Sequence, residues 1–412
     1  MSTPTNQFLR CCYFIDSLQG WAGGDSGTVI HTDDGGLNWI IQPTPIPNEH
    51  INDLFFLNER LGWGLAWDIT YDSNSYGTYI LKTMDGGTNW EAIRYPVNDV
   101  FMNTIFFLDS LTGYMGGFPL TIMKTTDGGY NWIPCYVDST AVVGGFPVNN
   151  FAFYSPSIAY ASGGFIDIAG VIWKTTDYGQ SWDAKAVGPE PVNGLFLFDS
   201  ITVLGVGGDY EYGTGIVKTT NGGANWDYES LYIFGIAFSV AFRTEAEGWA
   251  PMGFAQQWIY TLDSGKTWQD IETPDSSRIY DVQFTDNRNG FAVGEDGVIL
   301  KYNQEAINVP NNQNLIPTET KLYQNYPNPF NPSTVIEYSL PKPSYVILKV
   351  YDLLGRELMT LRNEVQKTGE YKINFTNSTL PSGVYFYKLY TKTLDSNQPK
   401  ESVSTKKMVL VK

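Results

Sequence analysis

The chain has 412 residues, enough for more than one globular domain. Glycine is frequent (41 residues), aromatic residues make up 15% and charged residues only 17%, which is typical of short strands joined by tight turns. The net charge of −17 opposes binding to nucleic-acid phosphates and to anionic lipid, so we expect neither as a partner. No stretch has the ~20 consecutive apolar residues of a membrane span, and three cysteines make a poor disulfide framework.

A turn motif recurs six times in the first three quarters of the chain. Each copy begins with Thr, continues through Asp or Asn and Gly, and ends with Trp, and successive tryptophans are 42 to 51 residues apart. This period is that of a four-stranded propeller blade. The copies are Thr32–Trp39, Thr83–Trp90, Thr125–Trp132, Thr175–Trp182, Thr219–Trp226 and Thr261–Trp268.

A second pattern precedes each turn motif and occurs once more after the last. It consists of an apolar residue, a few turn residues, then Gly, an aromatic or other apolar residue and small residues, and its seven copies begin at Phe14, Phe56, Phe107, Phe153, Phe198, Phe242 and Phe284. Seven inner strands predict an all-β, seven-bladed β-propeller over residues 9–302. The last blade lacks a motif and hence a fourth strand, and we expect residues 1–8 to be the remnant of that strand, lying beside residues 298–302.

The motif TxDxGxxW resembles the Asp box, which occurs in sialidases, in xyloglucan-cleaving endoglucanases, in sortilin-type receptors and in photosystem II stability and assembly factors. The pairing of GWAGG with TxDGGxNW is most similar to the last group. That resemblance implies a propeller that grips a partner polypeptide.

We interpret the boxes as structural. The Asp or Asn side-chain oxygen is suited to accept amide protons of its own turn, and the Trp to pack on the sheet. The boxes lack the spaced oxygen ligands of a calcium loop, so we expect no metal or cofactor there or elsewhere. The paired residues are Asp34 and Trp39, Asp85 and Trp90, Asp127 and Trp132, Asp177 and Trp182, Asn221 and Trp226, and Asp263 and Trp268.

After Tyr302 the composition changes. Residues 303–321 are polar and rich in Asn and Pro, which predicts a linker, and residues 322–412 alternate apolar and polar positions between Gly and Pro turns, which predicts a small antiparallel β-sandwich. This segment resembles the C-terminal sorting domain of type IX secretion cargo in YPNPFNP at 326–332, YDLLG at 351–355, residues 380–389 and KKM at 406–408.

The second resemblance implies recognition by the type IX secretion machinery and a location outside the cell or on its outer surface. The residues that carry the sorting signal by this resemblance are Pro327, Asn328, Pro329, Gly383, Lys406 and Lys407. Such cargo needs a signal peptide, whereas the first residues have neither a basic front nor an apolar region. We interpret the start of the sequence as truncated or misassigned.

Ligand binding is expected on the propeller face that carries the blade-joining loops, because insertions in propellers gather on one face. The two longest repeats carry extra residues at 66–79 and 137–150. Aromatic rings flanked by carboxylates suit a sugar or a peptide. The candidate ligand-binding residues are Trp67, Tyr71, Tyr76, Phe118, Phe165, Tyr210, Tyr212, Trp258, Asp68 and Asp209.

The expected function is therefore that of a secreted, non-catalytic propeller that binds a protein or glycan partner. Two alternatives stay open. A sialidase-like or xyloglucanase-like glycoside hydrolase needs only two carboxylates at a set separation, and the loops hold Asp68, Asp167, Asp209 and Glu211. A purely structural surface or adhesion component would instead pack the aromatic rings within their own loops. His31 is expected to be a strand-surface residue and not a catalytic base, and His50 lies in a blade-joining loop where contact with a ligand is the alternative. No catalytic residue is assigned.

Overall fold

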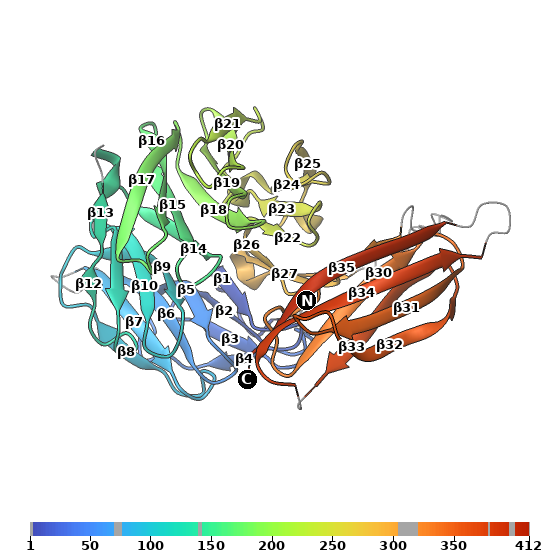
Figure 1. The fold of residues 1–412 in the computed structure, drawn as a ribbon. Coiled ribbons are helices and arrows are strands. Elements are labelled where there is room, and N and C mark those ends of the chain that lie inside the picture. The colour runs from blue at the N-terminus through green and yellow to red at the C-terminus, as the bar shows by residue number, and fades with distance from the viewer. Residues whose placement is uncertain are drawn as a thin grey trace. The chain divides into compact units, whose positions relative to one another are not determined.

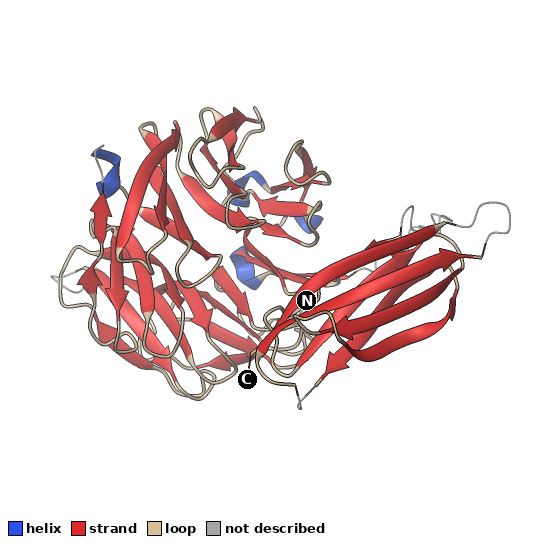
Figure 2. Ribbon diagram, in the orientation of Figure 1, coloured by secondary structure: helices blue, strands red, loops and turns tan. Residues whose placement is uncertain are grey.

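The computed structural model describes residues 3–69, 76–138, 142–303, 320–377, 380–394 and 400–411. The chain divides into two compact units, Met1–Ile307 and Asn308–Lys412, which are treated separately below. Strands dominate both units, and only short 3₁₀ turns interrupt them in the described residues (Figure 2). Within that described part, no helix is long and apolar enough to cross a membrane.

Seven sheets follow one another along the described part of the first unit, around a ring in which β1 packs beside β26 (Figure 1). We number them as blades 1 to 7. Blade 1 contains β1 (Leu9–Phe14), β2 (Gly20–Gly24), β3 (Val29–Thr32) and β4 (Ile40–Gln42). Blade 2 contains β5 (His50–Phe56), β6 (Gly62–Asp68), β7 (Gly77–Thr83) and β8 (Glu91–Arg94). Blade 3 contains β9 (Phe101–Phe107), β10 (Gly113–Phe118), β11 (Ile122–Thr125) and β12 (Ile133–Pro134).

Blade 4 has an additional outer strand, β13, which pairs with β17 in parallel. Its strands are β13 (Tyr136–Asp138), β14 (Val148–Phe153), β15 (Ala159–Phe165), β16 (Ala169–Thr175) and β17 (Ser181–Gly188). Blade 5 contains β18 (Val192–Leu197), β19 (Val203–Asp209), β20 (Gly213–Thr219) and β21 (Asp227–Ser230). Blade 6 contains β22 (Ala241–Phe242), β23 (Gly248–Pro251), β24 (Gln257–Thr261) and β25 (Gln269–Glu272), and blade 7 contains β26 (Ile279–Phe284), β27 (Asn289–Gly294) and β28 (Ile299–Asn303). The 3₁₀ turns are η1 (Val142–Gly145), η2 (Gly253–Ala255), η3 (Pro274–Ser276) and η4 (Glu295–Gly297).

The Phe and Gly of the repeated sequence pattern pack against each other. A Cβ added to Gly62 would lie 2.4 Å from the ring of Phe56, so a larger residue would displace that ring. The ring of Phe56 in turn stacks on Trp21 of the preceding blade, with centroids 3.6 Å apart. Phe291 of blade 7 stacks in the same way on Phe14 of blade 1, at 3.8 Å. The repeated pattern therefore encodes the packing between blades as well as within them.

Each Asp box forms hydrogen bonds within its own turn and with side chains of the preceding blade. In blade 3, Oδ1 of Asp127 accepts the amide protons of Tyr130 and Asn131 at 3.0 and 2.9 Å. These hydrogen bonds hold the pKa of Asp127 at about 2. The carbonyl of Gly128, in the same turn, accepts protons from Trp63 Nε1 and from Lys82 Nζ of blade 2, at 3.0 and 2.9 Å.

The same lysine position links most of the ring. Lys124, Lys174 and Lys218 also donate from Nζ to a box carbonyl of the next blade. Blade 1 differs, because His31 contacts Gln19 Oε1 and stacks on Trp21.

Blade 7 closes on blade 1 through side chains of its first strand. Asp281 Oδ2 accepts the amide proton of Cys12 at 2.9 Å, and Gln283 exchanges hydrogen bonds with the backbone of Phe14. In the described residues blade 7 has three strands, and residues 3–8 do not pair with β28. Thr3 instead bonds through Oγ1 to the carbonyl of Gly297, in the turn between β27 and β28. The fourth-strand remnant expected at residues 1–8 therefore stays a prediction, and the contact of Thr3 places the described part of this segment beside the turn that precedes β28.

The second unit is a sandwich of two antiparallel sheets. One sheet contains β29 (Lys321–Leu322), β30 (Ser333–Leu340) and β33 (Gly369–Thr376), and the other contains β32 (Glu357–Gln366), β31 (Ser344–Tyr351), β34 (Gly383–Thr393) and β35 (Glu401–Leu410). Alternating residues of these strands form one buried core, which includes Ile336, Val346, Leu348, Tyr387 and Met408. The all-β fold predicted for both parts is confirmed.

Candidate functional site

The two faces of the propeller carry different residues. Each box joins the third and fourth strands of its blade, whereas the ends of the second strands lie on the opposite face because neighbouring strands are antiparallel. We call this opposite face the loop face. It carries Trp67, Phe118, Phe165 and Asp209, each at or next to the end of a second strand.

Five aromatic rings lie on the loop face of blades 2 to 4, in one group of two and one group of three. Ring centroids are 5.7 Å apart for Trp67 and Phe101, 5.4 Å for Phe118 and Phe165, and 5.0 Å for Phe146 and Phe165. We call these five residues the aromatic surface. Trp67 is oriented by a hydrogen bond from Nε1 to the carbonyl of residue 102, at 2.7 Å.

A groove of about 450 Å³ joins the two halves of the aromatic surface. Trp67, Phe101 and Phe118 line it together with Ile69, Asn103 and Pro147. Phe118 keeps 40% of its surface exposed, so packing within its own loop leaves part of this ring accessible to a ligand. The arrangement offers apolar stacking surfaces next to one amide side chain.

The groove adjoins a larger cavity, of about 640 Å³, between the inner strands of the blades. Asn103 lines both. Its side chain belongs to a chain of amides at the same position of successive blades: Asn103 Nδ2 donates to Asn149 Oδ1 at 3.0 Å, and Asn149 Nδ2 donates to Asn193 Oδ1 at 3.1 Å. Each of these residues occupies a β-bulge of its inner strand, which turns the side chain out of the sheet.

This row of asparagines was not among the predicted site residues. A repeated dipeptide in the sequence could have identified this row: an apolar residue followed by Asn, just before or within the inner strand. It occurs as Ile51-Asn52, Met102-Asn103, Val148-Asn149 and Val192-Asn193.

Asp53 also lines this cavity and joins two blades. Its Oδ2 accepts the amide proton of Ile105, in blade 3, at 2.8 Å, and its Oδ1 accepts that of Leu54 at 2.9 Å. Removal from solvent raises the pKa of the Asp53 carboxyl to about 7. Its hydrogen bonds with backbone amides indicate a structural role for Asp53. Because its pKa lies near neutral pH, we expect it to make the stability of the propeller depend on pH.

The predicted acidic residues are largely engaged in local bonds. Asp68 is buried and forms an ion pair with Arg94, with Nε and Oδ2 3.4 Å apart. Asp209 is buried at the end of β19, where Oδ1 accepts the amide protons of Glu211 and Tyr212 at 3.1 and 2.6 Å. The structure brings Asp209 close to Asp167 and Glu190, and not to Asp68.

The remaining predicted aromatic residues do not join the aromatic surface. Tyr210 and Tyr212 are exposed in the loop after β19, where Tyr210 lies 5.8 Å from Phe234. Trp258 is buried against Trp249 and lines a separate apolar pocket between blades 6 and 7.

The 66–79 loop is described only at its ends. The carbonyl of Tyr76 accepts protons from Arg94 Nη2 and from the amide of Asp99. Tyr71 lies outside the described residues.

The predicted sorting residues converge at one end of the second unit. Oδ1 of Asn328 accepts the amide proton of Val409 at 2.8 Å, and its Nδ2 contacts the carbonyl of Lys407 at 3.4 Å. Phe330 bridges to Leu410, which also pairs with Gly383. Pro327 and Pro329 are exposed on either side of Asn328, and Lys406 and Lys407 lie on β35.

Comparison with known families matches both parts of the chain. Residues 65–228 and 221–303, together more than half of the chain, match the family described as photosynthesis system II assembly factor YCF48. The chain belongs to this family. The photosystem II assembly factor resemblance is confirmed. Residues 324–409 match the secretion system C-terminal sorting domain, so this YCF48-family propeller carries a type IX sorting tail, which implies secretion to the cell surface or the extracellular space.

One curated relative and two solved structures are similar to this chain or to parts of it. The photosystem II stability/assembly factor HCF136 of Arabidopsis thaliana is 38% identical over 71 residues, which is 17% of this chain and 17% of that protein. A structure of YCF48 bound to D1 peptide has a TM-score of 0.57 at 22% identity and covers 74% of this chain and 95% of that one. PorZ, a surface component of the type IX secretion system of Porphyromonas gingivalis, has a TM-score of 0.50 at 14% identity and covers 100% of this chain and 60% of that one. At these identities the two structures show a shared fold.

Proposed function

We propose that the propeller is a non-catalytic binding module that holds an extended polypeptide partner on its loop face after export. The observation that carries the proposal is the aromatic surface with its groove of about 450 Å³. Concave apolar surfaces with a few polar groups are the usual form of binding sites. Phe118, exposed by 40%, has no role in the buried clusters between the blades, so packing alone does not account for it.

A polypeptide with apolar side chains suits the groove better than a sugar, because the groove offers a free polar atom on a wall that is otherwise apolar. Asn103 donates both its amide protons to protein acceptors, while its Oδ1 has no donor among the described residues and remains an acceptor for a backbone N–H. The walls beside it are almost entirely apolar: Trp67, Ile69, Phe101 and Phe118. The structure of a related propeller with a D1 peptide supports this choice of ligand class.

The carboxylates favour binding over hydrolysis. A glycosidase needs one carboxyl group as a free acid or base beside the sugar. Asp68 is held by Arg94, and Oδ1 of Asp209 is held by two backbone amides. Neither of them lines the groove, whose described lining residues include no carboxylate.

The experiment is binding of the full chain to an array of synthetic peptides of varied charge and aromatic content, with a glycan array in parallel. We expect peptide signals that fall on Phe118→Ala and Phe165→Ala. Met84→Ala is the matched control, because Met84 is an exposed apolar residue in a box on the opposite face. Signals on glycans alone, or an equal loss with the control variant, would contradict the proposal.

A further inference from the structure

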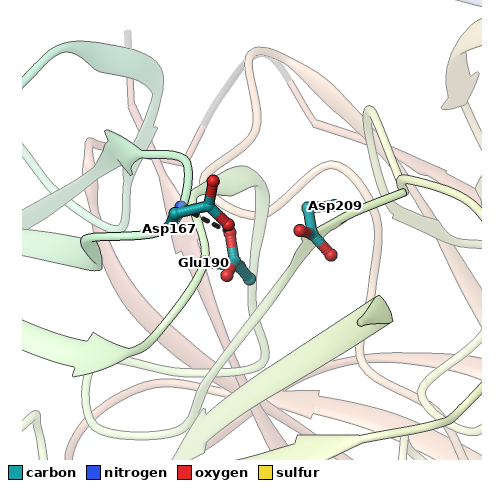
Figure 3. A group of neighbouring side chains, drawn as sticks. All are labelled: Asp167, Glu190 and Asp209. Atoms are coloured by element: carbon teal, nitrogen blue, oxygen red, sulfur yellow. Dashed lines mark hydrogen bonds between the residues drawn. The ribbon is translucent and has the colours of Figure 1, made fainter. Parts of the chain in front are cut away.

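Three carboxylates from separate segments meet on the loop face where blades 4 and 5 adjoin. Asp167 lies in the turn between β15 and β16, Glu190 in the loop between β17 and β18, and Asp209 at the end of β19. Figure 3 shows the three side chains gathered together. One oxygen of each lies within 4.8 Å of those of the other two.

Two of these carboxylates are almost fully buried, with 3% of Glu190 and 4% of Asp209 exposed. Glu190 Oε2 accepts the amide proton of Asp167 at 3.1 Å, and Asp209 Oδ1 accepts the amides of its own turn. Glu190 Oε1 and Asp209 Oδ2 have no hydrogen-bond donor, and none of the three acids has an ion-pair partner, among the described residues. Burial and the neighbouring carboxylates raise the pKa of Glu190. Carboxylates that are this buried and have no positive neighbour are stabilised either by taking up a proton or by binding a cation.

Blade 2 contains the same acidic pair together with a cation. Asp68 ends the second strand and pairs with Gly77, as Asp209 ends the second strand of blade 5 and pairs with Gly213. Glu49 precedes the first strand of blade 2 at the position that Glu190 has before blade 5. In blade 2, Arg94 Nε lies 3.4 Å from Asp68 Oδ2, whereas burial raises the pKa of Glu49 and its Oε2 has no hydrogen-bond partner among the described residues.

Blade 5 replaces this arginine. Arg94 pairs with Tyr79 in blade 2, and the equivalent pair in blade 5 is Ser230 with Gly215. Blade 5 therefore has Ser230 where blade 2 has its guanidinium group, and it adds a third carboxylate, Asp167. In blade 2 the carboxylate at the end of the second strand thus faces a positive charge, and in blade 5 no described side chain supplies one to Asp209.

Three carboxylates are an oxygen-only ligand set, which favours a hard divalent cation. Calcium binds oxygen at about 2.3 to 2.6 Å, so two of its ligands can be about 5 Å apart, whereas magnesium at about 2.0 to 2.1 Å limits them to about 4.2 Å. The spread of up to 4.8 Å fits calcium. We propose that Asp167, Glu190 and Asp209 bind one calcium ion, which ties the loops of blade 4 to blade 5.

The proposal departs from the expectation of no metal in this chain. It concerns the loop face and leaves the Asp boxes as structural turns. It is also independent of the polypeptide partner, because its first test needs only calcium chloride.

The test is calorimetric titration of the metal-stripped full chain with calcium chloride, together with its melting temperature in the presence and absence of calcium. We expect one calcium ion per chain, with an affinity of about 10⁻⁴ to 10⁻³ M as in extracellular modules, and a rise in melting temperature. Asp167→Asn and Asp209→Asn should each weaken binding at least about tenfold. Asp68→Asn, the equivalent change in blade 2, should leave it unchanged.

A second variant transfers the arginine of blade 2 to blade 5. Ser230→Arg should abolish the calcium-dependent heat and raise the melting temperature without calcium, because the guanidinium group supplies the missing charge. The proposal is overturned if calcium produces neither heat nor a change in melting temperature, if Asp68→Asn loses binding as Asp209→Asn does, or if Ser230→Arg binds calcium like the parent.

Discussion

Lys301 Nζ donates a hydrogen bond to the carbonyl of Gly35 across 2.7 Å. The bond joins blade 7 to the box of blade 1, so it closes the ring by the same contact that links Lys82 to Gly128 between blades 2 and 3. Because blade 7 has three strands in the described residues, this side chain and the stacked pair Phe14 and Phe291 take a large share of the closure.

Lys301→Met should lower the free energy of unfolding of the propeller by about 1.5 to 3 kcal/mol, the range for a hydrogen bond from a charged group, and so lower its melting temperature. Lys266→Met is the control, because Lys266 is an exposed lysine within a box. Calorimetry of the full chain measures both. Equal melting temperatures for the two variants would show that Lys301 does not hold the ring closed.

Asp127→Ala should destabilise the propeller by about 1 to 2 kcal/mol, because the amides of Tyr130 and Asn131 lose their acceptor. Asp127→Asn should be milder, since Asn221 performs the same role in blade 5, where its Oδ1 accepts from Thr219 and Asn225. Thermal unfolding of both variants tests the order. A calcium-dependent rise in melting temperature that Asp127→Ala alone removed would instead make the box a metal ligand.

Asp53 should make stability depend on pH near neutrality. Its pKa is about 7 in the folded protein and near 4 when unfolded, so the folded state binds the proton more tightly. Its contribution is complete below the unfolded pKa and is lost as pH rises through the folded one. The melting temperature of the parent relative to Asp53→Asn should therefore fall as the pH rises from about 4 to about 7. A constant difference across this range would show that Asp53 is ionised throughout.

The tail should direct export through the end where Asn328 meets β35. The full chain, placed behind a signal peptide in a type IX-competent host, should reach the surface or the medium. The double change Lys406→Ala and Lys407→Ala should trap it in the periplasm. Circular dichroism of the purified variant checks that the sandwich still folds, and normal export of a folded variant would refute the role of these lysines.

The repeats made the fold predictable because their residues act locally. The Phe, the Gly that it covers and the box Trp recur in one order, and each contact repeats from blade to blade, as for Phe56 and Gly62. The individual contact of Thr3 with Gly297 was not predictable, because the two residues lie far apart in the sequence and no repeat connects them.

The site was predictable only in part for the same reason. Trp67, Phe118 and Phe165 follow from loop position, and the structure places all three on the aromatic surface. Trp258 is a tryptophan like Trp67, but it is buried between blades 6 and 7. Its burial comes from contact with Trp249, which its own position in the repeat does not predict. The acidic cluster unites residues 167, 190 and 209 from two blades, and no spacing rule within one repeat connects them.

The most direct test of the account is the dissociation constant of the full chain for the strongest peptide of the array, measured by calorimetry for the parent and four variants. The account predicts that Trp67→Ala and Phe118→Ala each weaken binding by about 5- to 150-fold, the equivalent of about 1 to 3 kcal/mol for an aromatic contact. Met84→Ala and Tyr130→Ala, on the box face, should leave the constant unchanged. Unchanged affinity in the loop-face variants, or a loss confined to the box-face variants, would contradict the claim that this propeller binds its partner through the aromatic surface.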